Sequence, residues 1–423
     1  MKTNKTTVIL AIIAIISILF CNYSYADTPQ STNSEQNLTL YSDAAILIDS
    51  ATGKVLAEKN SNEKMYPAST TKILTAIIAL ENCKLDDKIT ASYDAVMSIP
   101  VGYSNAAIQP DETLSLEELL NLFLIHSANE VGMILAEHIS GSVENFANLM
   151  NQKATEIGCK NTHFTNPSGI HDEEHYSTAY DMALIAQYCM KNETFRSIVS
   201  KPSCEVAATD KYEDRYFVNT NDLIRPSSQY YYEYAIGIKT GFTSQAKNCL
   251  IAASKKDNME LITVILGAQT TPDGKSARYL DSINLFEYGF NNYKFEEVMS
   301  QNETVQEITI KNATKETKNL SLLIKDSISS TVPMNFNSEN LDYSIELNKN
   351  ISAPIAEGST LGKISYNIDG VTYTSDLIAS HNVEKFDFIL LFGQIILVIV
   401  VLIILAKLLS PKISSHNLFK LLY

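Results

Sequence analysis

Two residues near the start of a long apolar run could perform covalent chemistry together. Ser69 and Lys72 lie within the stretch YPASTTKILTAIIAL. If Pro67 leads into a helix, the two side chains share one helix face, and the lysine amine leans back toward the serine hydroxyl. A serine with such a base beside it can act as a nucleophile. The first turn of a helix also offers unpaired N–H groups and a positive dipole end, which favour a developing oxyanion.

The Ser-x-x-Lys pattern is weak evidence when it stands alone, because serine is also a preferred N-cap residue of helices. The same pattern occurs at residues 61–64 and 244–247. Ser69 on its own is therefore better explained as the start of a helix.

Two further motifs follow along the chain. Ser127 and Asn129 belong to the sequence HSANE, which lies between two apolar segments of helical periodicity, where polar side chains can face a cleft. Lys239 and Gly241 belong to Lys-Thr-Gly, a motif that occurs once. Glycines in and beside a strand let another backbone approach closely, so a bound peptide could lie along this segment as an added strand.

The elements that would position these motifs are readable from hydrophobic periodicity and turn residues. An apolar segment beginning near Ala44 predicts a β-hairpin, and helices dominate from Pro67 to about Ala154. Ser115 and Glu118 form a capping-box pattern before a helix expected to run through Leu124. Later segments predict a helix at 178–190, a hairpin at 248–268 with its turn at 255–258, and a helix at 277–290. Strands at both ends with helices between them describe a layered α/β domain.

The C-terminal third has a different pattern of polar and apolar residues. From about Val298 to Asn382, polar residues alternate with Val, Ile and Leu, which predicts a small all-β domain. Residues 388–406 are almost continuously apolar, and at ~1.5 Å per residue they span about 28 Å, close to the thickness of a bilayer core. Lysines follow this segment and acidic residues precede it, so the positive-inside rule places the tail in the cytoplasm.

The N-terminal 26 residues read as an export signal with two lysines, an apolar core and small residues before a cleavage site after Ala26. Residues 27–40 are polar and suit a linker. We therefore expect the segments before the apolar helix to lie outside the cytoplasm.

Composition excludes other classes of protein. The chain has 423 residues, 45% of them hydrophobic and 19% charged, which suits two folded units and short accessory segments. A formal net charge of −15 argues against nucleic-acid binding, which needs a basic face. The cysteines that remain after signal cleavage are odd in number and free of Cys-x-x-Cys, so they signal neither a disulfide framework nor a zinc site. They are Cys83, Cys159, Cys189, Cys204 and Cys249.

Taken together and in this order, the motifs that begin at Ser69, Ser127 and Lys239 carry the signature of penicillin-binding proteins and serine β-lactamases. More narrowly, the chain resembles the serine D-alanyl-D-alanine carboxypeptidases, the low-molecular-mass penicillin-binding proteins. The resemblance runs from about Ala44 to Phe290 and includes HYSTAYDMALIA and GIKTGFTSQAKNCL. The order of signal, catalytic domain, β domain and C-terminal anchor also matches that family.

The resemblance implies a β-lactamase-like catalytic domain, an antiparallel sheet flanked by helices, at 41–292. It further implies a small β domain that acts as a spacer at 295–382, a transmembrane helix at 388–407 and a cytoplasmic tail at 408–423. The protein would then be a single-pass membrane protein with its catalytic domain on the extracytoplasmic side.

The resemblance also assigns roles for acyl transfer. Ser69 would attack the carbonyl between two D-alanines and form an acyl-enzyme, with Lys72 as its base. Ser127 would relay a proton to the leaving amine, and Asn129 would orient Lys72 and the substrate amide. The backbone N–H groups of Ser69 and Phe242 would form the oxyanion hole.

Binding roles complete the expectation. Lys239 and Thr240, next to Gly241, would hold the terminal carboxylate of the substrate, and Arg278 is a further candidate for that carboxylate. The partners would be a peptidoglycan stem peptide ending in D-Ala-D-Ala, β-lactam antibiotics and the cytoplasmic membrane, with no metal and no cofactor. Phe242 stands where some members have histidine, but since the backbone is used there we expect little loss.

Three alternatives remain open from the sequence. A β-lactamase of class A would place a glutamate in a loop after Ser-x-Asn, and the comparable stretch TNPSGI supplies none. A metalloenzyme could use His171 and His175 of HDEEH, but metalloproteases need a glutamate directly after the first histidine, on a helix. A catalytically silent wall-binding or penicillin-sensing protein is the third alternative, against which the three intact motifs argue.

Overall fold

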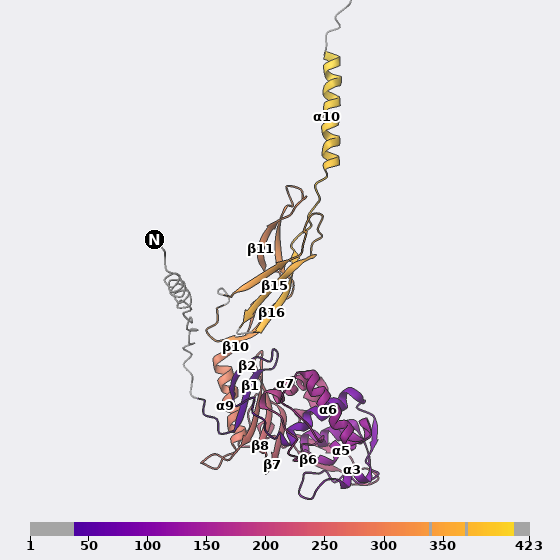
Figure 1. Ribbon diagram of the computed structural model, residues 1–423, viewed down its shortest axis with the longest axis vertical. Coiled ribbons are helices and arrows are strands. Elements are labelled where there is room, and N and C mark those ends of the chain that lie inside the picture. Colours follow the sequence, from indigo (N-terminus) through magenta and orange to yellow (C-terminus); the bar gives the residue numbers. More distant parts are fainter. Residues whose placement is uncertain (1–37, 338–340, 369–370, 410–423) are drawn as a thin grey trace, which may run out of the picture. The chain divides into compact units, whose positions relative to one another are not determined.

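The structure is a computed structural model that describes residues 38–337, 341–368 and 371–409. The described chain comprises a mixed α/β region, a C-terminal β region and one long apolar helix (Figure 1). The predicted signal at 1–26, most of the linker at 27–40 and most of the tail at 408–423 fall outside the described residues.

A five-stranded antiparallel sheet forms the centre of the α/β region, in the order β2-β1-β9-β8-β7. Its first strand pairs with a strand from the other end of the region, with Ile46 opposite Val264. This confirms the expectation that terminal strands share one sheet. The strands are β1 (Ala44–Asp49), β2 (Val55–Lys59), β7 (Ala235–Thr243), β8 (Lys247–Lys256) and β9 (Met259–Ala268). Strand β7, which carries Lys-Thr-Gly, lies at the sheet edge.

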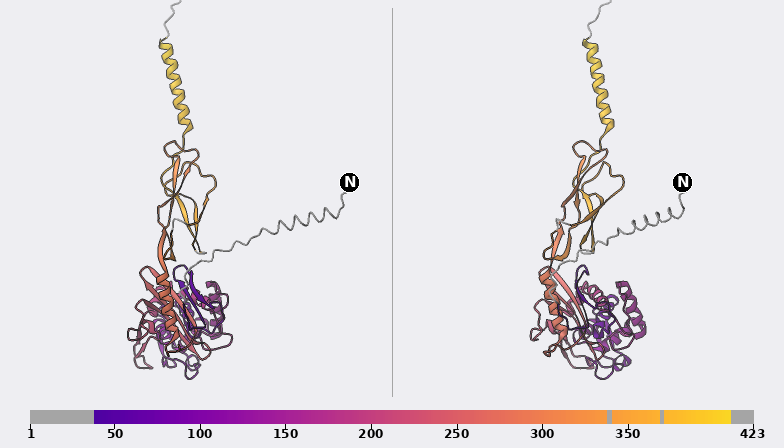
Figure 2. Two further views of the ribbon diagram at one scale, coloured as in Figure 1. Left: turned by 90° about the vertical axis from the view of Figure 1, so that its left-hand side faces the viewer. Right: turned by 60° about the vertical axis from the view of Figure 1, so that its left-hand side comes forward.

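Helices cover both faces of the sheet (Figure 2). Helix α9 (Ala277–Asn292) packs on one face, where a Cβ on Gly289 would lie 2.5 Å from Leu261 Cδ1, so glycine permits the close approach. The other face is covered by a helical layer in which α7 (Ala179–Met190) contacts the sheet. That layer includes α2 (Lys72–Asn82), α5 (Asn129–Ser140), α6 (Val143–Ile157) and α8 (Glu193–Val199).

Local sequence explains several helix starts. Ser115 and Glu118 form the predicted capping box at the start of α4 (Leu116–Asn121), and Thr178 caps α7 through the N–H of Asp181. The helix expected to run through Leu124 differs, because after α4 the chain continues as a π-helical turn, η2 (Leu122–His126). Shorter elements complete the region: β3 (Lys88–Thr90), α3 (Tyr93–Met97), β4 (Thr113–Ser115), β5 (Ser203–Val206), β6 (Arg215–Val218) and the 3-10 turn η3 (Asp222–Ile224).

The C-terminal region is a small β structure, as the alternating sequence predicts. Strand β10 (Tyr293–Met299) pairs with β13 (Ile328–Pro333), and a five-stranded sheet has the order β11-β12-β16-β15-β14. Leu320, Ile364 and Leu377 are fully buried in its core. The strands of the sheet are β11 (Thr304–Thr309), β12 (Asn319–Ile324), β14 (Tyr343–Leu347), β15 (Thr360–Ile368) and β16 (Val371–Ala379).

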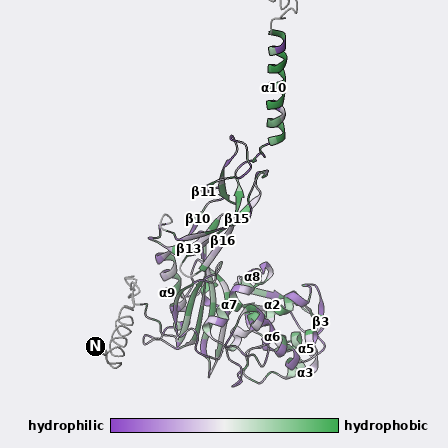
Figure 3. Ribbon diagram, turned by 45° about the horizontal axis from the view of Figure 1, so that its top comes forward, coloured by the Kyte–Doolittle hydropathy of each residue, from purple (hydrophilic) through white to green (hydrophobic). Residues whose placement is uncertain are grey.

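The last described element is α10 (Phe388–Leu409), a 22-residue helix long and apolar enough to cross a membrane. Figure 3, in which the ribbon is coloured by residue hydropathy, shows α10 as almost uniformly hydrophobic. None of its residues is buried against the rest of the chain, so it is not a core helix of a soluble domain.

Candidate active site

Ser69 and Lys72 lie together at the start of the helical layer. Ser69 belongs to a 3-10 turn, η1 (Ala68–Thr71), and Lys72 is the first residue of α2. Lys72 Nζ lies 2.8 Å from Ser69 Oγ. The sequence predicted this contact on an α-helical turn, whereas the turn is 3-10. Because residues three apart eclipse each other in a 3-10 turn, the tighter geometry favours the contact.

The environment of the Lys72 amine fits a neutral base. Lys72 Nζ also lies 2.7 Å from Asn129 Oδ1 and 2.6 Å from the carbonyl oxygen of Ser168. Both oxygens only accept hydrogen bonds. A neutral amine can donate its two N–H groups to them and keep its lone pair for the hydroxyl proton of Ser69. The three neighbours therefore match the hydrogen-bonding capacity of a neutral lysine.

The pKa values of two buried lysines, Lys72 and Lys239, are lowered in this site. Burial lowers the pKa of Lys72 well below its usual value, the nearby positive charge of Lys239 lowers it further, and Glu130 opposes the shift. Burial also lowers the pKa of Lys239 to about 7, with the charge of Arg278 contributing. Neither side chain has more than 1% of its surface exposed. The site thus favours a neutral amine at Lys72 and makes Lys239 easier to deprotonate than an ordinary lysine.

Ser127 and Asn129 flank the junction between η2 and α5. Ser127 has left-handed backbone geometry, with φ of 71°, at the point where η2 ends. Asn129 begins α5 and donates from Nδ2 to the carbonyl oxygen of Ser104, 2.8 Å away. The connection between two helices that the sequence pointed to is therefore present, and it directs both residues to the same cleft as Ser69.

Strand β7 passes directly beside the serine. A Cβ on Gly241 would lie 3.0 Å from the backbone nitrogen of Ser69, so glycine is what allows the strand to come this near. Lys239 Nζ donates to the carbonyl oxygen of Thr240 at 3.0 Å, and Thr240 Oγ1 donates to Thr220 Oγ1 at 2.7 Å. Phe242 is 63% exposed and lines the cleft.

Arg278 extends the positive end of the site. Its Nη2 donates to the hydroxyl of Tyr279 at 3.0 Å, and Nη1 lies 3.5 Å from the carbonyl oxygen of Gly241. Its buried Nε has no hydrogen-bond partner among the described residues. Since Arg278 lines the cleft beside Thr240, it retains donor capacity for an anionic ligand there.

These residues surround one cleft of about 570 Å³. Seven of the nine predicted site residues line it, namely Ser69, Ser127, Asn129, Thr240, Gly241, Phe242 and Arg278. Lys72 and Lys239 lie beneath it, buried. In the described part of the chain no aspartate or glutamate lines this cleft, so it lacks the carboxylate that a class A β-lactamase would present.

Several contributors carried no signal in the sequence. Thr220 and residues 101–104 also line the cleft, and Ser168 contributes a backbone carbonyl. The sequence signal for this loop was Gly169, the glycine that follows Asn-Pro-Ser. In the structure its φ is +76°, and a Cβ there would lie 1.9 Å from the carbonyl oxygen of Ala68. The glycine after Asn-Pro-Ser therefore allows that loop to close over the turn that carries Ser69.

Among the described residues, the HDEEH segment is not part of any group of three or more side chains that could hold a metal ion. His175 is buried, and its Nε2 contacts Thr71 Oγ1 at 2.9 Å. Its Nδ1 accepts from the N–H of Thr165 at 3.1 Å. Burial lowers the pKa of His175 to about 3, which keeps it neutral. It is a structural histidine that supports the turn before Lys72.

The two other Ser-x-x-Lys patterns are unlike the one at Ser69. Ser61 donates to Glu58, and Lys247 forms an ion pair with Asp43 at 2.6 Å. Neither pattern places its serine beside a buried lysine amine. Only the tertiary context distinguishes the three patterns.

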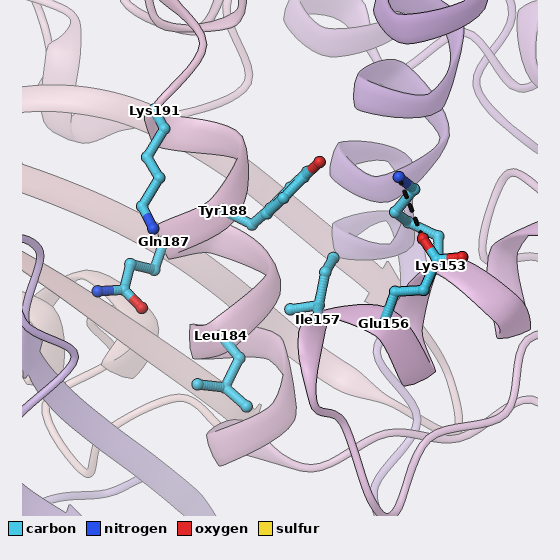
Figure 4. A pocket seen from close by; sticks show the side chains of 7 residues that line it. All are labelled: Lys153, Glu156, Ile157, Leu184, Gln187, Tyr188 and Lys191. Atoms are coloured by element: carbon cyan, nitrogen blue, oxygen red, sulfur yellow. Dashed lines mark ion pairs between the residues drawn. The ribbon is translucent and has the colours of Figure 1, made fainter.

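A second hollow lies between α6 and α7, away from this cleft (Figure 4). Lys153 lies on its rim and pairs with Glu81 at 2.9 Å and with Glu156 at 3.4 Å. Tyr188 also donates to Glu81, at 2.6 Å. Because these charges satisfy one another, the hollow offers a ligand little beyond surface contact.

Comparisons with known sequences identify two family matches. The family described as D-alanyl-D-alanine carboxypeptidase matches residues 30–270, and the C-terminal domain of penicillin-binding protein 5 matches residues 293–385. The D-alanyl-D-alanine carboxypeptidase DacF of Bacillus subtilis is 34% identical over 89% of this chain and 94% of its own length. DacC of Escherichia coli is 31% identical over 83% of this chain and 86% of its own length.

Solved structures give the same result. Penicillin-binding protein 5 from Haemophilus influenzae superposes with a TM-score of 0.64 at 28% identity, covering 82% of this chain and 98% of that one. The carboxypeptidase DacD from Francisella tularensis superposes with a TM-score of 0.61 at 27% identity, over 82% of this chain. The predicted fold class is confirmed by these matches.

Proposed function

Since the chain belongs to the D-alanyl-D-alanine carboxypeptidase family of penicillin-binding serine enzymes, we propose that Ser69 is the nucleophile with which it removes the terminal D-alanine from peptidoglycan stem peptides. The observation that carries this assignment is the position of the Lys72 amine, which two acceptor oxygens hold 2.8 Å from Ser69 Oγ. The sequence resemblance to this family is confirmed by the matches.

Acylation begins when Lys72 takes the hydroxyl proton of Ser69. The serine oxygen forms a bond to the carbonyl carbon of the penultimate D-alanine, and the carbonyl oxygen becomes an oxyanion. Ser127, at the same cleft, passes the proton from Lys72 to the leaving nitrogen. The C–N bond then breaks, free D-alanine departs and an ester of Ser69 remains.

The oxyanion would be stabilised by the backbone N–H groups of Ser69 and Phe242. The close approach at Gly241, where a Cβ would lie 3.0 Å from the Ser69 nitrogen, brings these two backbone segments side by side. A peptide added at the free edge of β7 would present its carbonyl to them.

The terminal carboxylate of the substrate would be held by the cationic end of the cleft. Lys239 and Arg278 supply charge, and Thr240 supplies a hydroxyl whose position is fixed by Thr220. Binding this carboxylate selects peptides with a free C-terminus, which is the requirement of a carboxypeptidase.

Deacylation reverses the proton path. Lys72 accepts a proton from water, the hydroxide attacks the ester, and Ser69 regains its proton as the shortened peptide leaves. A β-lactam follows the same first step, but the broken amide stays tethered to the acyl group. The tethered nitrogen blocks the approach of water, so penicillin binds covalently.

The segments around the catalytic region suggest its place in the cell. We propose that α10 crosses the cytoplasmic membrane, that the β region is a spacer and that the catalytic region lies on the extracytoplasmic side. Support comes from the apolar length of α10, from Lys407 in its last turn and from Glu384 and Asp387 before its start.

The function is tested by release of D-alanine from a synthetic peptide ending in D-Ala-D-Ala. Wild type should release it in the presence of EDTA, and Ser69→Ala should lose at least ~1000-fold in kcat. Ser61→Ala is the matched control, because it removes the serine of another Ser-x-x-Lys pattern outside the cleft, and it should retain activity. Equal activity of Ser69→Ala and wild type would refute the assignment.

A further inference from the structure

The wall of the cleft opposite β7 is fastened to the residues that surround Ser127. We call residues 101–106 the cleft wall, of which residues 101–104 line the cleft itself. Three consecutive residues of this wall are held: the carbonyl oxygen of Ser104 accepts from Asn129, and that of Asn105 lies 3.0 Å from His126 Nε2. The N–H of Ala106 donates to Glu130 Oε1 at 2.6 Å. The residues that hold the wall therefore come from both sides of Ser127 in the sequence.

The contact to Ala106 is unusual because it is made by a buried carboxylate, that of Glu130. It lies in the first turn of α5 with only 2% of its surface exposed, and its Oε2 has no hydrogen-bond partner among the described residues. Burying a carboxylate is costly unless it is paired and fully hydrogen-bonded. Burial raises the pKa of Glu130, while the backbone N–H groups of Ala106, Glu130 and Ile108 and the charge of Lys72 oppose the rise. The free-energy cost of burying this carboxylate indicates that Glu130 does more than fill space.

We propose that Glu130 is a positioning residue of the active site, which fastens the cleft wall at residues 101–106 to the start of α5 and thereby holds Asn129 against Lys72. This inference rests on the function proposed above. Glu130 itself does not line the cleft and would not touch the substrate.

The connection to the chemistry passes through the side chain of Asn129. Its Oδ1 accepts from Lys72 at 2.7 Å while its Nδ2 donates to the carbonyl oxygen of Ser104 at 2.8 Å. Its backbone N–H donates to the same oxygen at 2.9 Å. If the wall shifts, the amide loses the partner that fixes its orientation, and Lys72 loses one of the two acceptors that aim its lone pair at Ser69.

The charge of Glu130 acts on the same amine. The charges of Glu130 and of Lys72, at the start of α2, attract each other, and Lys239 on β7 is the neighbouring cation. The other charged or titratable groups at this wall include Tyr103 within it, His126 at the end of η2, and Arg215 on β6, which donates to the carbonyl oxygen of Ala106 at 3.4 Å and forms an ion pair with Glu112. A negative charge at Glu130 stabilises the protonated form of Lys72.

Three variants separate this role from simple structural support. Glu130→Ala removes the acceptor for the wall, and Glu130→Gln keeps an acceptor oxygen but removes the charge. Glu137→Gln is the matched control, because Glu137 lies on the same helix and holds Ser92 Oγ at 2.6 Å, outside the cleft. The readouts are the second-order rate constant for acylation by a fluorescent penicillin, its pH profile, and kcat and KM for the D-Ala-D-Ala peptide.

We expect Glu130→Ala to lower the rate constant for acylation by penicillin about 10- to 100-fold, as the loss of other supporting groups does. With the D-Ala-D-Ala peptide, the loss should appear mainly in kcat. Glu130→Gln should recover most of that loss. In the pH profile of acylation, the acid limb of Glu130→Gln should lie about 0.5 to 1 unit lower than that of wild type, because the Lys72 amine loses the nearby negative charge that favours its protonated form. Glu137→Gln should change neither quantity.

An acylation rate of Glu130→Ala equal to that of wild type, with only a lower Tm, would overturn the proposal. An acid limb of Glu130→Gln that coincides with that of wild type would overturn it equally. Failure of the proposed function looks different, because wild type itself would then remain unacylated, or Ser69→Ala would be acylated as fast.

Discussion

At the scale of residues, the proposed mechanism requires two buried lysines in different protonation states. In this proposal Lys72 is neutral, so that it can accept the proton of Ser69, and Lys239 is charged, so that it can bind a carboxylate. Lys72 has carbonyl acceptors around it, and burial and the neighbouring cation hold its pKa well below the usual value. Lys239 has a pKa of about 7, so it is readily protonated when an anion arrives. The substrate thus helps to set the charge of the site that binds it.

This pairing predicts a specific pH dependence. The acid limb of kcat/KM reports protonation of Lys72, and the alkaline limb reports loss of the proton from Lys239, near pH 7 in the free enzyme. In the complex, the substrate carboxylate raises the pKa of Lys239, so the alkaline limb of kcat should lie at higher pH than that of kcat/KM. Steady-state kinetics of the peptide over a pH series measures both limbs. Coincident alkaline limbs would contradict this assignment of charge to Lys239.

The side chains of the site could be named from the sequence because their motifs keep fixed spacings. Ser69 and Lys72 share a turn, and Lys239 stands in a glycine-flanked strand. The carbonyl of Ser168 and the carboxylate of Glu130 could not be named in this way. A backbone carbonyl has no residue-specific signature, and a glutamate at the start of a helix is ordinarily a solvent-exposed partner of the dipole.

At the scale of elements, the decisive feature is the close packing of a loop on a turn. The loop at residues 166–170 is closed by Asn166, whose Oδ1 accepts from the N–H groups of Gly169 and Ile170. It delivers the carbonyl of Ser168 to Lys72 and packs against Ala68, where φ is 47°. The 3-10 turn and this loop therefore form one unit that fixes the base.

Gly169→Ala tests that unit. A Cβ there would lie 1.9 Å from the carbonyl oxygen of Ala68, so the loop must move and the Ser168 carbonyl must leave Lys72. Acylation by penicillin should fall about 100-fold. Gly141→Ala is the matched control, since Gly141 also has positive φ, +80°, but has no atom within 4 Å of the new Cβ. The Gly141→Ala change should cost about 1 to 2 kcal/mol of unfolding free energy, because left-handed geometry strains an L-residue, and should leave acylation unchanged. Equal acylation rates in both variants would contradict the role of the loop.

Regular elements were predictable where their local signals agreed. The capping box at Ser115, the helix capped by Thr178 and the hairpin of β8 and β9 were all expected from sequence and are present. The π-helical turn before Ser127 was not expected, because its apolar residues fit an α-helix equally well. Leu122 to Ile125 are fully buried in this wider turn, and it ends at Ser127, which has left-handed backbone geometry.

At the scale of the whole molecule, the chain combines a catalytic region, a β region and an apolar helix. Both folded regions match domains of penicillin-binding enzymes, at residues 30–270 and 293–385. The apolar helix is the segment that differs in character from both, since all of its residues are exposed in the isolated chain. By length and composition it could cross a membrane.

Truncation tests the proposed anchor. A chain ending at Asp387 lacks α10 and should leave washed membranes for the soluble fraction, while it still binds penicillin. A chain ending at Leu409 keeps the helix, which at ~1.5 Å per residue spans about 33 Å, and should stay with the membrane. Fractionation followed by detection of fluorescent penicillin measures both. Retention of the shorter chain in washed membranes would show that α10 is not the anchor.

The central claim is that Ser69 forms the acyl-enzyme, and intact-mass spectrometry after incubation with benzylpenicillin tests it most directly. Wild type and Ser61→Ala should each gain one penicilloyl adduct, mapped by digestion to the peptide that contains Ser69, and Ser69→Ala should gain none. An unmodified wild-type protein, or an adduct of equal yield on Ser69→Ala, would contradict the mechanism.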